Sequence, residues 1–533
     1  MSSRVNDFGR LIERESSARG DFPVLTFVNV QSDGVLASQV RTYAALEKNG
    51  RLLAKWLQGQ GIGQGDAVLL MMRNYPEFVE AMVATSLLAA VFVPVDVRSM
   101  GDKLSFMINH VDAQVIIAEA AALPALEAIA DKLPSLRKIL VIDDLDEACC
   151  PSLPVSSASS DLPDDHVGLK TQLPDPQSPM FLMFTSGTTG NPKAVVRTHA
   201  SYMRGIKGLR ALGVNQSDVL YTGLPLCHIN AHSTLAAGIS MGLRTVFSRQ
   251  FTKSRLWDVC RAYDCTVFTL LGGMIPEIYA VPEAPDDKDN PVRMIISSGM
   301  PAKLWEQYER RFGVTITEVY GSTENGGTLI NRMGEGPRGS MGKPPPGLVA
   351  AILDDDDQPC QPFHPGHLCF RRDGGEVEKI SYFGNAKASA DKVAGGWFRS
   401  GDIAYADENG WIFFQHRTGG GVRRNGDFIN TALVESVLIQ SPAVLDVYVY
   451  GVGTPRNVAG EKTLVAAIVL NPGANLDEVK VWASGNLQRG EVPEVWQLLD
   501  AIPKTVSEKP VERETIALLE EAGLLDNYQE QVS

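Results

Sequence analysis

Helix and strand patterns alternate along the first third of the chain, and this alternation constrains the fold most. Residues 67–72, Ala-Val-Leu-Leu-Met-Met, form an unbroken apolar run of the length of a buried strand. Because parallel strands need crossover connections, such alternation predicts a parallel α/β sheet. The predicted helices are 43–58 and 76–90, and the predicted strands are 67–72, 91–95, 115–118 and 139–142.

The length and charge of the chain narrow its class. A chain of 533 residues is too long for one compact core, so two or more domains are expected. Hydrophobic residues make up 44% and charged residues 21%, as in ordinary globular enzymes. The formal net charge is −14, and broad nucleic-acid binding needs a positive field, so no nucleic-acid partner is expected.

The cysteines and the apolar runs exclude other classes. The seven cysteines have no regular spacing, which argues against a disulfide framework and a structural zinc site. The first 16 residues lack an apolar core, so no signal peptide is predicted. No apolar run reaches the roughly 18 residues that span a membrane. The expectation is a soluble, cytoplasmic protein without a membrane span.

Composition also predicts the domain organisation. Residues 144–179, rich in Ser, Pro and Asp, are expected to be a surface connection. Residues 347–414 have short, turn-rich strand patterns typical of a β-rich subdomain. Three glycines at 419–421 then suit a hinge. We therefore expect a large N-terminal α/β domain over 1–418, with parallel sheets and the β-rich subdomain, and a small mobile α+β domain over 419–533.

The segment 184–195, Phe-Thr-Ser-Gly-Thr-Thr-Gly-Asn-Pro-Lys-Ala-Val, has the chemistry of a phosphate-binding loop and follows an apolar strand at 180–183. Glycines let the backbone approach phosphate oxygens, hydroxyls donate hydrogen bonds, and lysine adds a positive charge. The spacing is not that of a Walker A loop. A solvated turn is the alternative. The residues concerned are Thr185, Ser186, Gly187, Thr188, Thr189, Gly190 and Lys193.

This loop resembles the phosphate loop of the adenylate-forming superfamily, which includes acyl-CoA synthetases, amino-acid adenylation domains and luciferases. Similar segments follow in the family's order over almost the whole chain. Within the superfamily, the chain is most similar to the carnitine/crotonobetaine–CoA ligases, because of the layout at His228 and at residues 423–426. The other similar segments are 42–46, 63–68, 320–324 (Tyr-Gly-Ser-Thr-Glu), 339–344, 397–402 and 503–509.

The resemblance implies an ATP-dependent, AMP-forming carboxylate–CoA ligase that uses ATP, Mg²⁺ and coenzyme A. Glu324, with Thr185, would hold the magnesium ion, and Thr323 would contact the α-phosphate. Asp402 would accept both ribose hydroxyls, because a carboxylate has the lone pairs for a diol. Arg417 would contact ribose or phosphate. The adenine would lie against Ser298, Gly299, Met300 and Pro301 and stack on Tyr320, followed by Gly321 and Ser322.

The resemblance also assigns the groups for acyl transfer. Lys509 would be the adenylation lysine, although Glu508 replaces the family's usual glycine. His228 would border the channel for the carboxylate and CoA, and Gly426 would give the pantetheine thiol room. Arg423 stands where lysine is usual, and Gly419 replaces the charged hinge residue. A homodimer is possible.

The sequence leaves the acid and the acceptor open. Residues 230–231, 271–274, 298 and 325–328 are expected to line the acid pocket, with Gly326 and Gly327 marking open space. These residues are mostly small and uncharged, which favours a bulky or modestly polar acyl group. Two other functions remain: loading a separate carrier protein with the acyl group, and non-catalytic nucleotide binding.

Overall fold

The computed structural model describes most of the chain. The described residues are 7–146, 150–185, 191–205, 208–271, 274–279, 281–354, 356–417, 422–424, 427–429, 431–454, 457, 461–503, 510 and 512–525. The side chains of residues 276, 277, 416, 417, 427, 428, 432, 436 and 513 are not described.

The first large sheet has seven strands, and all pairs but one are parallel. The exception is the antiparallel hairpin of its last two strands, which flanks the predicted phosphate loop. In spatial order the strands are β7 (Val155–Ser157), β6 (Lys138–Val141), β5 (Val115–Ala118), β3 (Ala67–Met71), β4 (Val91–Val95), β8 (Pro179–Thr185) and β9 (Lys193–Thr198).

The second large sheet has eight strands, with antiparallel strands at both edges and parallel pairs between them. In spatial order they are β15 (Thr328–Asn331), β14 (Thr315–Gly321), β13 (Met294–Ser298), β12 (Val267–Leu271), β10 (Leu220–Thr222), β11 (Thr245–Ser248), β1 (Pro23–Val30) and β2 (Leu36–Thr42).

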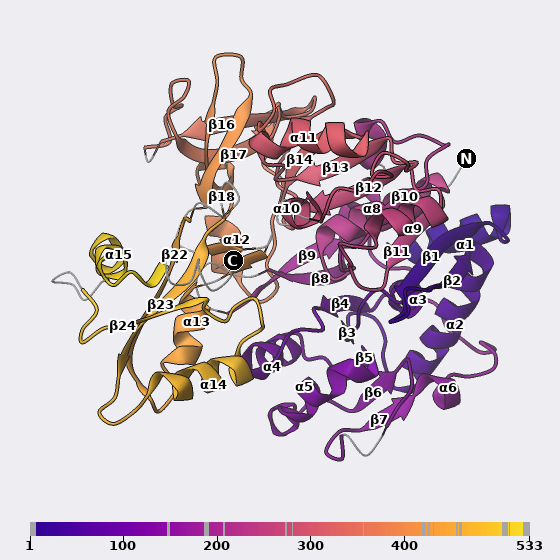
Figure 1. Cartoon of the computed structure of the whole chain (residues 1–533). Helices are drawn as coiled ribbons and strands as arrows, with labels where there is room; N and C mark the ends of the chain where they lie inside the picture. Colours follow the sequence, from indigo (N-terminus) through magenta and orange to yellow (C-terminus); the bar gives the residue numbers. More distant parts are fainter. Residues whose placement is uncertain are drawn as a thin grey trace.

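A layer of helices shares its core with both sheets. Buried side chains of helices α1, α2, α3 and α8 form one cluster with Phe92 and Phe181 of the first sheet and Phe27 and Phe247 of the second (Figure 1). Together with these four, the described α-helices of residues 7–347 are α1 (Phe8–Arg19), α2 (Tyr43–Gly59), α3 (Pro76–Leu87), α4 (Gly101–His110), α5 (Leu123–Glu127), α6 (Ala158–Asp161), α7 (His199–Gly205), α8 (Ile229–Met241), α9 (Leu256–Ala262), α10 (Met274–Tyr279) and α11 (Ala302–Phe312).

Local sequence sets the ends of these helices. The Thr42 hydroxyl accepts the Ala45 N–H and caps α2. Pro76 begins α3, where its missing N–H removes no hydrogen bond. Gly242, at φ 68°, ends α8 in the left-handed conformation that glycine tolerates.

A four-stranded antiparallel sheet packs against both large sheets, since its core includes Val195 of β9 and Leu329 of β15. It is the β-rich part that the sequence predicts. Its strands are β16 (Leu348–Leu353), β17 (Gly366–Arg372), β18 (Phe398–Ala406) and β19 (Ile412–Arg417), and α12 (Ala386–Asp391) lies between β17 and β18 in the chain.

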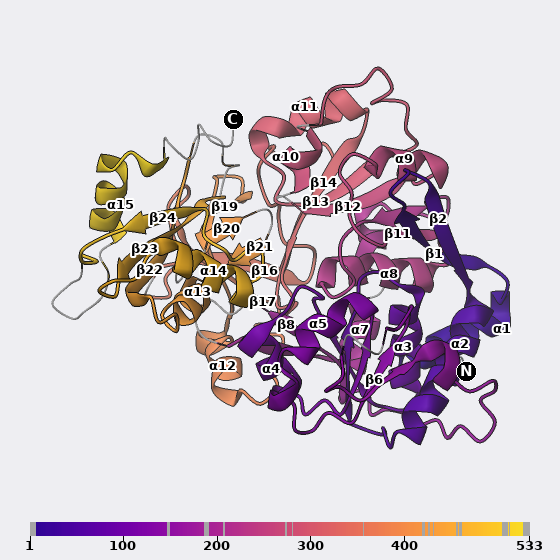
Figure 2. The same cartoon turned by 60° about the horizontal axis from the view of Figure 1, so that its bottom comes forward.

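The chain after β19 forms a smaller α+β unit to one side of the large part (Figures 1 and 2). Its core is separate. It contains the hairpin β20 (Val422–Arg424) and β21 (Asp427–Ile429), the sheet of β22 (Val444–Val452), β23 (Thr463–Leu470) and β24 (Val495–Leu498), and helices α13 (Thr431–Leu438), α14 (Leu476–Asn486) and α15 (Glu512–Glu521).

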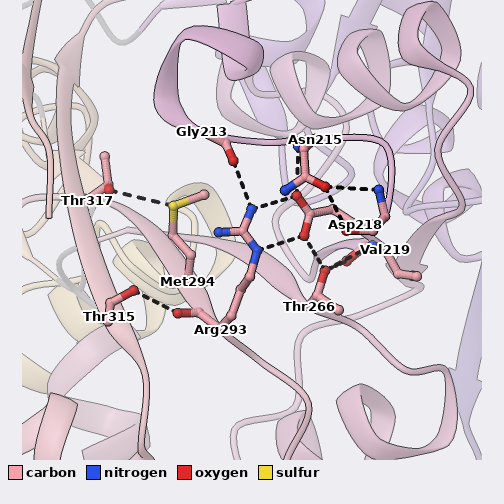
Figure 3. A network of polar contacts seen from close by, with 10 residues as sticks. Gly213, Asn215, Asp218, Val219, Thr266, Arg293, Met294, Thr315 and Thr317 are labelled. Atoms are coloured by element: carbon pink, nitrogen blue, oxygen red, sulfur yellow. Dashed lines mark hydrogen bonds and ion pairs between the residues drawn. The ribbon is translucent and has the colours of Figure 1, made fainter.

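A polar network joins the amino ends of neighbouring strands in the second sheet (Figure 3). The Asp218 carboxylate, just before β10, accepts hydrogen bonds from Arg293 at 2.8 and 2.6 Å and from Thr266 at 2.8 Å. Thr266 precedes β12 and Arg293 precedes β13. In open α/β sheets, ligands bind at the opposite, carboxyl ends of strands, so this network supports the fold rather than the site.

The predicted α/β class is confirmed, and strands 91–95 and 115–118 have the predicted bounds. The surface connection over 144–179 is partly wrong, because residues 155–157 pair with β6 at the edge of the first sheet. A strand of only three residues in a Ser- and Pro-rich segment shows too little periodicity to be predicted from the sequence. Among the described residues, no helix combines the length and hydropathy that crossing a bilayer requires.

Candidate functional site

The predicted nucleotide residues that the structure describes lie where the β-rich sheet meets the two large sheets. Strand β13 leads into residues 298–301, and β14 leads into 320–324. The hairpin of β8 and β9 brings Thr185 and Lys193 opposite each other as a strand pair. Carboxyl ends of parallel strands are the usual place for ligands in α/β sheets.

Tyr320 and Asp402 are in direct contact although they come from different sheets. The Tyr320 hydroxyl donates a hydrogen bond to the Asp402 carboxylate, and the Tyr320 ring stacks on Phe370 with centroids 6.1 Å apart. The backbone N–H of Asp402 donates to the Ser400 hydroxyl at 3.0 Å, which fixes the turn. The predicted adenine and ribose partners therefore lie at one place.

Glu324 and Lys193 are joined through Tyr382. The Tyr382 hydroxyl donates to Glu324 Oε1 at 2.7 Å, and Lys193 Nζ lies 5.5 Å from the centre of the Tyr382 ring. Burial raises the pKa of Glu324, but the charge of Lys392 and the hydrogen bond from Tyr382 outweigh it and hold the pKa below its usual value. The carboxylate is thus ionised at neutral pH.

A buried carboxylate supports the predicted adenine wall. Glu318 of β14 accepts the backbone N–H groups of Gly299 and Met300, the latter at 3.1 Å. Gly299 has φ 96°, a conformation that favours glycine. Burial raises the pKa of Glu318, and the two backbone hydrogen bonds and the charge of Arg423 oppose this rise. Ser298 donates to the Val319 carbonyl at 2.6 Å, and Pro301 caps α11.

His228 borders a cavity of about 570 Å³ between the carboxyl ends of the two large sheets. Its Nε2 lies 3.5 Å from Asp96 Oδ2, and Arg98 donates to both oxygens of Asp96. Burial raises the pKa of Asp96, but the hydrogen bonds from His228 and Arg98 hold it well below its usual range. The walls of the cavity include Arg73, Asp96, Arg98, Glu119, Cys227, Arg249, Leu271 and Met274.

One expectation about the acid pocket is wrong. Gly326 and Gly327 do not mark open space, because a side chain there would lie 2.3 Å from Phe398 and 2.2 Å from Phe370. These glycines let aromatic rings of the β-rich sheet pack on the backbone. The cavity beside Leu271 and Met274 also has charged walls, because strand ends distant in sequence add the arginines and carboxylates.

Several predicted residues lie outside the described part of the chain: Ser186, Gly187, Thr188, Thr189, Gly190, Gly426 and Lys509. The hinge glycines and Glu508 do so too. For Arg417 only the backbone is described, paired with Asp402 between β18 and β19. Arg423 lies in β20, 5.9 Å from the centre of the Phe414 ring.

The sequence did not reveal three residues of the site: Asp96, Glu318 and Tyr382. Asp96 follows a predicted strand, which was a usable signal for the carboxyl edge of a sheet. Glu318 lies two residues before Tyr320, inside an apolar strand, where a buried carboxylate needs a partner. Tyr382 has no local signal for its role, because its hydroxyl and ring reach Glu324 and Lys193, which are 58 or more positions away.

The residues present fit a hard divalent cation. Glu324 supplies an ionised carboxylate. Thr185, which pairs with Lys193 between β8 and β9, supplies a hydroxyl. Mg²⁺ prefers one or two carboxylates together with water and phosphate oxygens. By contrast, Asp96, Cys227 and His228, whose ligand atoms lie within 4.8 Å of one another, include a thiol and an imidazole, which do not suit Mg²⁺.

Sequence profiles match most of the chain. The profile of the AMP-binding enzyme family matches residues 12–375, and that of the AMP-binding enzyme C-terminal domain matches residues 433–509. The chain is 30% identical over 462 residues to the medium/long-chain-fatty-acid–CoA ligase FadD17 of Mycobacterium marinum, covering 84% of this chain and 85% of the relative. It is 26% identical to the crotonobetaine/carnitine–CoA ligase of Salmonella agona, covering 89% and 92%.

Solved structures have the same fold. The o-succinylbenzoate CoA synthetase of Bacillus subtilis bound to a CoA product analogue has a TM-score of 0.78 at 21% identity, over 95% of this chain and 97% of that one. In complex with its acyl-adenylate, that enzyme has a TM-score of 0.63. The chain therefore belongs to the AMP-binding enzyme family, and within it to the adenylate-forming acyl-CoA synthetases.

Proposed function

We propose that this ligase joins a carboxylic acid to coenzyme A in two half-reactions at the site around Tyr320, Glu324 and Asp402. In the first, the acid's carboxylate attacks the α-phosphorus of ATP and pyrophosphate leaves. In the second, the CoA thiol attacks the acyl carbon and AMP leaves. The observation that supports this assignment is the convergence of Tyr320 with Asp402 and of Lys193 with Glu324.

In the first half-reaction, this chain orients the nucleotide and spreads its charge. Asp402 accepts the ribose hydroxyls, and Tyr320 with residues 298–301 encloses the adenine. Ser186 to Gly190, Lys193 and Thr323 bind the phosphates. Lys509 brings an ammonium between the attacking carboxylate and the α-phosphate, where charge builds up in the transition state.

We propose that Glu324 and Thr185 hold Mg²⁺ beside the phosphates. When bound, the ion supplies charge neutralisation for the phosphate oxygens. The low pKa of Glu324 suits this role, because only the ionised carboxylate is a good ligand.

For the second half-reaction we propose that the chain divides into residues 1–418 and 419–533. The smaller part turns after adenylate formation, with Gly419 as the hinge. His228 borders the path of the thiol, Gly426 leaves room for pantetheine, and Arg423 approaches the adenine wall. The higher TM-score with a CoA-analogue complex is consistent with such an arrangement.

The acid is proposed to carry a bulky or modestly polar acyl group. Relatives are named for medium- and long-chain fatty acids and for crotonobetaine and carnitine. Arginines and carboxylates together line the cavity at His228, which tolerates polar substituents better than a purely apolar wall does. We also propose a cytoplasmic homodimer, which light scattering after gel filtration and cell fractionation would test.

The test is pyrophosphate release with a panel of fatty acids and betaine-type acids, with and without CoA, for the wild type and Lys509→Ala. We expect acid-dependent release that CoA accelerates, together with acyl-CoA in equal amount. Lys509→Ala should lower release at least 100-fold while ATP binding persists.

Other results favour other functions. Release that CoA does not change, without acyl-CoA formation, points to loading of a separate carrier protein. ATP binding without pyrophosphate release for any acid points to a non-catalytic nucleotide-binding protein.

A further inference from the structure

Tyr382 lies between the two charged groups of the phosphate region and contacts both. Its side chain is buried, with 5% of its surface exposed. Its hydroxyl reaches Glu324 Oε1 at 2.7 Å, and its ring lies under Lys193 Nζ at 5.5 Å.

The backbone around Tyr382 is fixed to the strand that follows the phosphate loop. Residues 381–383 run antiparallel to residues 194–196 of β9. The Val196 N–H donates to the Ser381 carbonyl, and the Phe383 N–H donates to the Ala194 carbonyl, both at 2.8 Å. This segment thus extends the β8–β9 hairpin, so the backbone at Tyr382 is held against β9.

Glu324 belongs to a different element, the turn after β14 in the second large sheet. The hydroxyl of Tyr382 therefore joins the first sheet to the second at the cation-binding carboxylate. A hydrogen bond to an ionised acceptor is about twice as strong as a neutral one and restricts the orientation of the acceptor. A lysine over an aromatic face is held by the ring quadrupole.

We propose that Tyr382 is a positioning residue of the nucleotide site, which orients the Glu324 carboxylate towards the divalent cation and keeps Lys193 at a constant separation from it. This inference rests on the proposed function. Tyr382 does not itself touch the reacting atoms. Its hydroxyl acts on the cation ligand, and its ring acts on the phosphate-binding lysine.

The experiment measures ATP binding by calorimetry, with Mg²⁺ and with EDTA, for the wild type and Tyr382→Phe. The ring remains in this variant, so ATP affinity in EDTA should stay within about two-fold. The free Mg²⁺ concentration at which half of the Mg²⁺-dependent gain in ATP affinity is reached should rise about 3- to 10-fold. This is the effect expected when a charged group in a partly solvated site loses a hydrogen bond.

Two further variants separate positioning from a general effect on structure. Tyr382→Leu removes the ring as well and should weaken ATP binding in EDTA too. In a Glu324→Gln background, Tyr382→Phe should have no further effect on Mg²⁺ dependence, because the group it orients is gone. Tyr405→Phe is the matched control: Tyr405 of β18 stacks on Phe413 of β19 in the β-rich sheet, with centroids 5.0 Å apart.

An unchanged Mg²⁺ requirement for ATP binding in Tyr382→Phe would overturn the inference. An equal effect of Tyr382→Phe on the Mg²⁺ dependence of ATP binding in the wild type and in the Glu324→Gln background would also overturn it. Because ATP binding needs neither acid nor CoA, these results are independent of whether any acid releases pyrophosphate. A failed acid panel contradicts the ligase proposal, whereas a failed coupling between Tyr382 and Glu324 contradicts only this one.

Discussion

At the scale of single residues, the site depends on contacts between groups far apart in the sequence. Tyr320 and Asp402 are separated by 82 positions, and Tyr382 and Glu324 by 58. Each pair joins an ionisable carboxylate to a phenol hydroxyl, which orients the carboxylate before a ligand arrives. Orientation before binding lowers the entropy that the complex must lose.

Asp402→Asn should weaken ATP binding about 10- to 100-fold, because the amide cannot accept hydrogen bonds from two hydroxyls and from Tyr320 together. Calorimetric titration with ATP and with 2′-deoxy-ATP measures the loss. The 2′-deoxy nucleotide should be affected less than ATP. Exposed Asp356, which lies in the turn after β16 and would be changed to Asn, is the control. Equal affinities for Asp402→Asn and the wild type would contradict the ribose assignment.

His232→Phe should make stability less dependent on pH. His232 is buried against Phe181, with ring centroids 5.4 Å apart, and burial lowers its pKa to about 3. The unfolded chain binds a proton near pH 6.5 and the folded chain does not, so stability is lost as pH falls from 6.5 towards 3. The contribution is about 2 kcal/mol at pH 5.

Urea denaturation at pH 7.5 and pH 5 tests this prediction. The loss between the two pH values should be smaller in His232→Phe than in the wild type by about 2 kcal/mol. The change of exposed His166 to Gln should leave the loss as it is. An identical loss in His232→Phe would mean that His232 is protonated in the folded chain.

At the scale of elements, one end of the second sheet supports the fold and the other end carries the site. The Asp218 network joins the starts of β10, β12 and β13 (Figure 3). The ends of β13 and β14 lead into the adenine wall and the Tyr-Gly-Ser-Thr-Glu turn. A defect at the starts should therefore change stability without changing the site.

Arg293→Ala should lower the free energy of unfolding by about 3 kcal/mol, because the Asp218 carboxylate, with 1% of its side chain exposed, would lose its charged partner. Thermal and urea unfolding measure this, and KM for ATP should not change. Burial raises the pKa of Asp218, but Arg293 and the other hydrogen bonds lower it below its usual value. The stabilisation is therefore present above the unfolded pKa and is lost as pH falls through the folded one.

The exposed pair of Lys132 and Asp102 gives a matched control, because its 2.6 Å contact lies in solvent. Lys132→Ala should change stability by less than about 1 kcal/mol. Similar losses in Arg293→Ala and Lys132→Ala would contradict a special role for the Asp218 network.

At the scale of the whole molecule, α4 and the chain after α14 hold the smaller unit against the large part. Lys103 of α4 contacts Glu491 at 2.8 Å, and both side chains are mostly buried, with 17% and 13% exposed. Gln488 donates to the Ser99 hydroxyl at 3.4 Å. The proposed rotation of the smaller unit would break these contacts, so they stabilise the present arrangement relative to the rotated one.

Glu491→Gln should slow acyl transfer from a preformed acyl-adenylate to CoA about 3- to 5-fold, while pyrophosphate release stays the same, because about 1 kcal/mol of support for this arrangement is lost. Rapid-quench measurement of the two half-reactions checks this. Lys480→Ala, which removes an exposed pair with Asp477 on α14, is the control. A slower first half-reaction in Glu491→Gln would assign the contact to the other arrangement.

The sequence by itself determined the α/β class and the positions of five strands of the first sheet, and it predicted the residues of the nucleotide motifs. These follow from apolar periodicity and from short runs whose chemistry is local, such as Thr185 to Lys193 and Tyr320 to Glu324. Strand β4, for example, is buried along its whole length and has its predicted bounds.

Only the tertiary structure decided which groups meet. Tyr382 reaches Glu324, Glu318 holds the backbone at Gly299, and Asp96 holds His228, and each contact joins two elements. It also reversed the interpretation of Gly326 and Gly327, where aromatic rings from the β-rich sheet fill the expected space. Local periodicity records how a segment is buried, but not which distant segment buries it, because that depends on the packing of whole sheets.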